Sequence, residues 1–182
     1  MARILIVYST TDGHTLTICE RLRASLLPRG HQVTLLPLAA ADSAALQACD
    51  KIVLGASIRY GKHNPAVNAF IARHQAVLEA RPNAFFSVNV VARKPEKNSA
   101  QTNPYVRKFL RSIAWRPQHV AVFAGRIDYP RYRFFDRAMI RLIMALTGGP
   151  TDLHTNVEFT PWDEVRRFAG RIAALAEGRA TG

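Results

Sequence analysis

The sequence predicts an α/β fold, a doubly wound parallel sheet of five strands with helices on both faces. Short apolar runs alternate with amphipathic segments of helical length, and a polar turn containing a glycine joins the first run to the first helical segment. Strands that alternate with helices are joined by right-handed crossovers, and they therefore form a parallel sheet. A length of 182 residues with 48% hydrophobic residues fits a single domain and excludes a disordered or collagen-like chain.

The elements follow one another regularly. Residues 3–8 (RILIVY) form an apolar run typical of a strand buried on both faces. Residues 15–27 carry apolar side chains at helical spacing and end before Gly30, a helix-stop signal. The last helix is expected to begin at Thr160 as N-cap, with Pro161 in the first position, and to run to about residue 176. Between these, strands are expected at 32–36, 51–55, 84–91 and 118–124, and helices at 42–48, 65–80 and 105–114.

This order fits the flavodoxin-like strand order 2-1-3-4-5, whose ligand site lies at the carboxyl ends of the strands. Residues 126–156 are too long for an ordinary connection, and we expect them to be an insertion that splits the fifth strand within a single domain. Inside this insertion a helix is predicted, with Arg133, Arg137 and Arg141 on one stripe and apolar side chains over the rest of its surface.

The chain is strongly basic, with a formal net charge of +12. Residues 93–141 alone hold 12 Lys and Arg against three Asp and Glu. Such a field attracts nucleic acid, acidic lipid or a carboxylate ligand, although a solvated basic surface is the simpler alternative. No apolar run approaches the roughly 20 residues of a membrane-spanning helix, and the first residues do not read as a signal peptide. The two cysteines form no disulfide or zinc pattern, so we expect a cytoplasmic protein without a metal.

A polar loop after the first strand is a candidate phosphate site. It consists of Ser9, Thr10, Thr11, Asp12, Gly13, His14 and Thr15. Its hydroxyls, its glycine and the free N–H groups of the following helix can bind a phosphate. It lacks both the lysine of a P-loop and the GxGxxG pattern of a dinucleotide site. A monophosphate bound without cationic side chains suggests FMN; the alternative is a helix cap that binds nothing.

Two later loops should flank the isoalloxazine ring of such a cofactor. The loop after the third strand contains Ala56, Ser57, Ile58, Arg59, Tyr60 and Gly61, and the loop after the fourth contains Ser87, Asn89, Val90, Val91, Ala92 and Arg93. Tyr60 is a candidate to stack on the ring, with an ordinary surface tyrosine as the equal alternative. The second loop offers no aromatic residue, which would leave one flavin face open to a flat substrate.

Four segments narrow the interpretation further: residues 55–61 (GASIRYG), 87–89 (SVN), 92–97 (ARKPEK) and 129–133 (YPRYR). Together they resemble the bacterial quinone-dependent (menaquinone-dependent) protoporphyrinogen IX dehydrogenases, which are flavodoxin-like enzymes, and the similarity extends over almost the whole chain. The resemblance implies FMN as the only cofactor and oxidation of protoporphyrinogen IX to protoporphyrin IX in haem biosynthesis. It also implies electron transfer to menaquinone or ubiquinone, at the cytoplasmic face of the inner membrane.

Basic side chains near these segments are candidates to pair with the two propionates of the substrate: Arg93, Lys94, Lys97, Arg131 and Arg133. The insertion helix, with its arginine stripe and wide apolar surface, suits peripheral binding to an anionic membrane. The alternative is a helix that packs on the core and turns its arginines to water. Nothing in the sequence identifies a catalytic proton acceptor.

Other functions remain open. A basic flavodoxin-type electron carrier would have no substrate site, and a porphyrinogen-dependent turnover would separate the two. An NAD(P)H:quinone oxidoreductase is also possible, because such enzymes can bind nicotinamide without a second nucleotide fingerprint. A nucleic-acid-binding module fits poorly, because the basic residues lack aromatic residues interleaved along a strand face.

Overall fold

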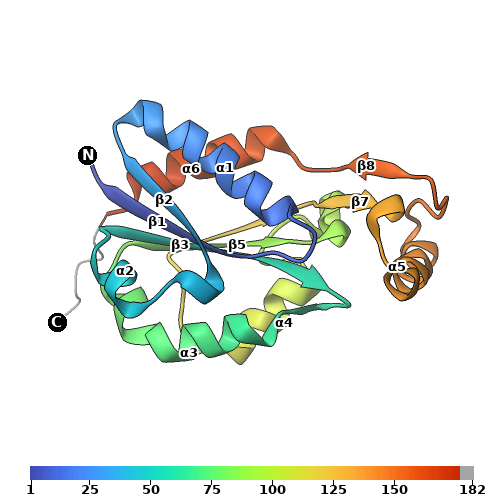
Figure 1. The fold of residues 1–182 in the computed structure, drawn as a ribbon, viewed down its shortest axis with the longest axis horizontal. Coiled ribbons are helices and arrows are strands. Elements are labelled where there is room, and N and C mark those ends of the chain that lie inside the picture. The colour runs from blue at the N-terminus through green and yellow to red at the C-terminus, as the bar shows by residue number, and fades with distance from the viewer. Residues whose placement is uncertain (177–182) are drawn as a thin grey trace.

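A computed structural model, which describes residues 1–176, shows one parallel sheet between two helical layers (Figure 1). The strands β1 (Arg3–Ser9), β2 (Gln32–Pro37), β3 (Lys51–Arg59), β5 (Asn83–Val88) and β6 (His119–Phe123) pair in parallel in the order β2-β1-β3-β5-β6. Counted among themselves, these five strands have the order 2-1-3-4-5, so the predicted fold class is confirmed. The short β4 (Lys62–His63) pairs antiparallel with the end of β3.

Helices cover both faces of the sheet. On one face lie α1 (His14–Leu26) and α6 (Trp162–Ala174), and on the other lie α2 (Ser43–Gln47), α3 (Pro65–Ala80) and α4 (Pro104–Ser112) (Figure 1). Short 3-10 turns complete the frame at Leu27–Arg29, Leu38–Ala40, Val90–Arg93, Pro95–Lys97 and Tyr129–Arg131. The sheet is therefore buried on both sides, as its apolar strands require.

Helix starts have identifiable chemical causes. The side chains of Asp42, Asn64 and Asn103 each accept a hydrogen bond from a backbone N–H in the first turn of α2, α3 and α4. Thr160 differs from expectation, because it does not cap α6. Its hydroxyl instead donates to the carbonyl oxygen of Ala124 at 3.0 Å, and α6 begins at Trp162.

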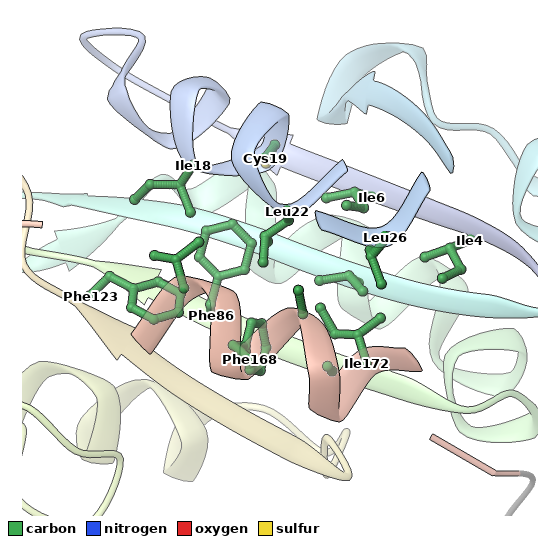
Figure 2. Close-up of a cluster of buried hydrophobic side chains, with 14 of the residues drawn as sticks. Ile4, Ile6, Ile18, Cys19, Leu22, Leu26, Phe86, Phe123, Phe168 and Ile172 are labelled. Atoms are coloured by element: carbon green, nitrogen blue, oxygen red, sulfur yellow. The ribbon is translucent and has the colours of Figure 1, made fainter. Parts of the chain in front are cut away.

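Two aromatic clusters hold the layers together. On one face, the rings of Phe86, Phe123 and Phe168 lie 5.7 to 6.1 Å apart, centre to centre, among aliphatic side chains of α1 and α6 (Figure 2). On the other face, Phe85 contacts the ring of Trp115. Neighbouring residues of a strand point to opposite faces, so Phe85 and Phe86 together anchor both helical layers to β5.

The insertion leaves the main sheet after β6. It contains β7 (Arg126–Asp128), α5 (Phe134–Thr147) and β8 (Asn156–Glu158), and it projects beyond one end of the sheet (Figure 1). The expectation that it splits the fifth strand is wrong in one respect: β8 pairs antiparallel with β7 in a separate two-stranded sheet. All three residues of β8 are exposed, whereas a strand in the main sheet would need apolar side chains for two buried faces.

The exposed surface of α5 is mainly apolar. Phe134, Phe135 and Leu146 are 77%, 81% and 78% exposed, whereas Arg137 is half-buried. The Nε atom of Arg137 donates to the carbonyl oxygen of Tyr129 at 3.1 Å, so this residue does not belong to an outward arginine stripe. Within residues 1–176, no helix has both the length and the apolar character needed to cross a bilayer.

Substitution of Phe86 tests the core. Phe86 is completely buried, and Phe86→Ala should lower the free energy of unfolding by about 3–5 kcal/mol because it leaves a cavity between the sheet, α1 and α6. The matched control Phe135→Ala, at a side chain that is 81% exposed, should change it by no more than about 0.5 kcal/mol. Urea unfolding measures both, and equal losses for the two variants would contradict this description of the core.

Candidate cofactor and substrate site

A cavity of about 510 Å³ lies at the carboxyl ends of β1, β3 and β5. Its volume falls within the range of about 300–1,000 Å³ typical of small-molecule sites. Three loops of the main fold form one part of its wall, and β7, α5 and the turn between them form another. The position is the one at which an open parallel sheet binds its ligand.

Most of the predicted cofactor residues line this cavity. They are Thr10, Thr11, Asp12, Gly13, His14, Thr15, Ser57, Ile58, Arg59, Tyr60, Gly61, Asn89, Val90 and Val91. The remaining predicted residues, Ser9, Ala56, Ser87, Ala92 and Arg93, lie outside the wall. Ala56, Ser87 and Ala92 are buried behind it, where they support the loops.

The loop after β1 presents an unsatisfied hydroxyl. Gly13 caps α1 with a positive φ of 85°, a backbone conformation that favours glycine. Two residues later, Thr15 is 0% exposed and lines the cavity, and its Oγ1 atom has no hydrogen-bond partner within the described chain. Leaving such a donor unpaired costs about 1–3 kcal/mol. A phosphate oxygen at the N-terminus of α1 would satisfy both the hydroxyl and the helix dipole.

His14 is fixed by the chain that follows β6. Its Nε2 atom lies 2.6 Å from Oγ1 of Thr160. The Thr160 hydroxyl already donates to the carbonyl oxygen of Ala124, so Nε2–H of His14 is the donor and Nδ1 is left as an acceptor in the neutral ring. Burial lowers the pKa of His14, which favours that neutral form.

Arg59 contacts charged and aromatic side chains from several parts of the cavity wall. Its Nη2 atom lies 2.6 Å from Oδ1 of Asp12 in the phosphate loop, and its Nη1 atom lies 3.5 Å from Oδ1 of Asp136 in α5. The guanidinium carbon is 5.8 Å from the ring centre of Tyr60 and 5.5 Å from that of Tyr132, within cation–π range. A single side chain at the end of β3 thus contacts the loop after β1, the insertion and Tyr60 in the loop after β3.

Tyr60 is held in an unusual conformation. Its φ of 52° lies in the left-handed region, a strained position for a residue with a side chain. Its hydroxyl donates to Oδ1 of Asp136, and its side chain is partly exposed at the cavity. Tyr60 therefore contacts the insertion from the loop that was predicted to flank the flavin.

The predicted substrate-binding residues separate into two groups. Arg131 lies on the cavity wall, whereas Lys94, Lys97 and Arg133 do not. The guanidinium of Arg93 is directed elsewhere, to backbone and side-chain oxygens described below. Of the candidates for a propionate partner, Arg131 is the one that the structure places at the cavity.

The structure adds wall residues that the sequence did not single out for the site. Among them are three apolar side chains of α5 and three residues of β7 and the turn after it: Ile140, Ile143, Met144, Arg126, Asp128 and Tyr132. The first three recur at i, i+3 and i+4, the spacing of one helix face, which was the signal available in the sequence. The Nη2 atom of Arg126 lies 3.2 Å from Oδ2 of Asp128, so these two charges compensate each other.

A buried polar network lies behind the loop after β5. The Nε2 atom of His63 is 3.0 Å from Oγ of Ser87, and burial lowers the pKa of His63 to about 4, so its ring is neutral near pH 7. The Oδ1 atom of Asn89 accepts hydrogen bonds from the backbone N–H of Ala92 and from Nδ2 of Asn103, each at 3.1 Å. These bonds hold the loop that forms one side of the cavity.

This fold and this phosphate loop define a flavodoxin-type flavoprotein, and the flavodoxin domain family model matches residues 5–154. Sequence identity identifies one family among the proteins that share this fold. The chain belongs to the family of the protoporphyrinogen IX dehydrogenases (quinone). The Escherichia coli (strain K12) member is 45% identical over 175 residues, which cover 96% of this chain and 97% of that protein. The Leishmania major member is 47% identical over 174 residues, covering 95% of this chain and 75% of that protein.

Solved structures agree on the fold. Oxidised flavodoxin 2 from Bacillus cereus has a TM-score of 0.58 at 19% identity and covers 95% of this chain and 99% of its own. Flavodoxin 1 from the same organism has a TM-score of 0.55 at 10% identity, covering 94% and 97%. The flavodoxin domain makes FMN the cofactor of this chain. The unpaired hydroxyl of Thr15 and the converging loops fit that cofactor.

Thr15→Val tests the phosphate assignment. The substitution removes one hydrogen bond to a charged group, so FMN affinity should fall about 10- to 100-fold. The stability of the FMN-free protein should stay the same or rise, because the unsatisfied hydroxyl is lost. Flavin fluorescence titration and urea unfolding measure the two effects.

The matched control is Ser25→Ala, which removes a hydroxyl from the same helix. The Ser25 hydroxyl donates to the carbonyl oxygen of Arg21 at 3.0 Å and is not on the cavity wall. FMN affinity should not change in this variant. An unchanged affinity in Thr15→Val would remove Thr15 from the phosphate site.

Proposed function

We propose that this protein oxidises protoporphyrinogen IX to protoporphyrin IX with bound FMN and passes the electrons to a quinone. The observation that carries this function is the identity of 45% over 96% of the chain to the E. coli dehydrogenase. The substrate loses six electrons and six protons in total, so three quinones become three quinols. When bound, FMN supplies the redox chemistry in two-electron steps, and the protein supplies binding, orientation and exclusion of water.

The insertion supplies an apolar wall for a substrate, which an electron carrier would not need. Ile140, Ile143 and Met144 turn an apolar surface toward the same cavity as the flavin loops. A tetrapyrrole can pack against such a wall, which excludes water from the reacting carbon. Arg131 lies on the wall and would pair with a propionate through a bidentate contact. These residues support a dehydrogenase with its own substrate site.

Porphyrin fluorescence tests the proposed reaction. FMN-loaded protein is mixed without oxygen with protoporphyrinogen IX and either a menaquinone or a ubiquinone analogue. Fluorescence should grow only when protein and quinone are both present, and the faster analogue identifies the preferred acceptor. NADH in place of the porphyrinogen tests the oxidoreductase alternative. Quinone reduction in the NADH mixture, together with no growth of fluorescence in the porphyrinogen mixtures, would overturn the proposed function.

We also propose that α5 binds peripherally to a membrane surface, the cytoplasmic face of the inner membrane, where a lipid-soluble quinone resides. The support is the cluster of exposed apolar side chains on this helix, including Phe134, Phe135 and Leu146. Contiguous exposed apolar surface of this kind marks an interaction site. The exposed Arg133 and Arg141 flank it and would favour anionic head groups.

The double variant Phe135→Ser/Leu146→Ser tests this surface. Each side chain is about 80% exposed in the free protein, and burying one in lipid contributes about 1.5–3 kcal/mol, so binding to anionic vesicles should fall at least tenfold. Leu27→Ser is the matched control, because Leu27 is 50% exposed on the main domain. Sedimentation with vesicles gives the comparison. Equal binding of the double variant and the wild type would contradict the membrane assignment.

A further inference from the structure

The two ends of α5 form hydrogen bonds with two different loops of the cofactor cavity. At the first turn, Asp136 accepts a hydrogen bond from the Tyr60 hydroxyl, and its Oδ1 atom lies 3.5 Å from Nη1 of Arg59. Arg59 is the last residue of β3, and Tyr60 is the first residue of the loop that follows it. Because Arg59 also binds Asp12 in the phosphate loop, the N-terminus of α5 is connected to two of the three loops that face the flavin.

At the last turn, Arg93 makes the corresponding connection to the third loop. Its Nη1 atom donates to the carbonyl oxygen of Val90 at 3.1 Å, and its Nη2 atom donates to the carbonyl oxygen of Thr147 at 3.0 Å. The hydroxyl of Thr147 donates to Ile143, so its oxygen can accept a further bond from Nη2 at 3.3 Å. The carbonyl groups of the last turn of a helix have no partner within that helix, and Arg93 satisfies one of them.

The fit at this end is close. A Cβ atom at Gly149 would lie 2.9 Å from Nη2 of Arg93 and 2.5 Å from Sδ of Met144. A side chain at this position would have to displace the ends of both side chains, so glycine leaves room for the guanidinium at the helix end. Between Asp136 and Thr147, α5 turns Ile140, Ile143 and Met144 toward the cavity.

We propose that Arg59 and Arg93 are positioning residues that hold α5 over the cofactor cavity, so that FMN binding and the placement of the substrate wall are coupled. Arg93 was a candidate for the substrate propionates; its donors are instead directed to Val90 and Thr147. The substrate part of this proposal rests on the proposed function, whereas the coupling between FMN and α5 does not.

The coupling follows from shared residues. FMN would order the loops that contact Asp136 and Thr147. A bound cofactor therefore reduces the mobility of α5 without contacting either end of this helix. A ligand that rigidifies one element lowers the entropic cost of the next binding event that needs the same element. Binding energies are reciprocal, so release of α5 must also weaken FMN binding.

Hydrogen exchange of the peptide that covers α5 tests the coupling without substrate. In the wild type, FMN should slow amide exchange in residues 134–147 by about fivefold or more, the scale of a modest coupling. In Asp136→Asn/Arg93→Ala this protection should be lost. Arg141→Ala, a change at an exposed arginine of the same helix, is the matched control and should keep it. Equal protection in the double variant and the wild type would overturn the proposal.

Steady-state kinetics test the substrate wall. Arg93→Ala should raise the KM for protoporphyrinogen IX about tenfold, with a smaller change in kcat, because the wall is displaced while the flavin chemistry remains. Arg93→Lys should recover part of the loss, since one ammonium can bridge fewer acceptors than a guanidinium. A fall in kcat alone, with KM unchanged, would contradict a positioning role. If the wild type shows no porphyrinogen turnover, the proposed function fails, but the exchange experiment still decides the coupling.

Discussion

The carboxyl ends of β1, β3 and β5 lie side by side because the sheet is parallel, and every part of the site depends on that constraint. The turn after β1 begins α1 and places Thr15 in the cavity, where its hydroxyl lacks a partner. The turns after β3 and β5 reach the same space from neighbouring strands. None of these segments is close in sequence, and the sheet alone brings them together.

The insertion adds a further wall to the cavity at these strand ends. It does not widen the main sheet; it forms a separate hairpin of β7 and β8 and turns α5 back across the cavity. The helix has two apolar surfaces: Ile140, Ile143 and Met144 line the cavity, and Phe135 and Leu146 lie exposed to the outside. In the proposed function, the first surface contacts the substrate and the second binds the membrane.

The sequence was sufficient for the main sheet and the helices that cover it, because strand and helix periods are local properties; it did not predict the separate hairpin of β7 and β8. The place of the loop after β1 on the cavity wall was also predictable, since hydroxyls and a glycine follow a buried strand directly. The roles of Arg59 and Arg93 were not, because their partners Asp136 and Thr147 lie 77 and 54 residues away along the chain. Charge alone suggested ligand binding for Arg93, whereas its geometry shows a connection between two protein segments.

The expected arginine stripe on α5 was wrong for a similar reason, because its orientation depends on contacts that are distant in the sequence. The spacing of Arg133, Arg137 and Arg141 indicates one helix face, but it does not say which way the face turns. In the structure Arg137 satisfies carbonyl groups of the preceding turn, and apolar side chains take the outer surface. Orientation is decided by tertiary contacts, and these depend on residues that the periodicity does not include.

In the proposed reaction, α5 and the flavin loops form one site in which the substrate reduces bound FMN. Anaerobic mixing of FMN-loaded protein with protoporphyrinogen IX, without quinone, tests it most directly. The visible absorbance of the oxidised flavin should bleach at a rate that saturates with substrate, and it should return when a quinone is added. A flavin that stays oxidised with the porphyrinogen, yet is reduced by dithionite, would contradict this reaction.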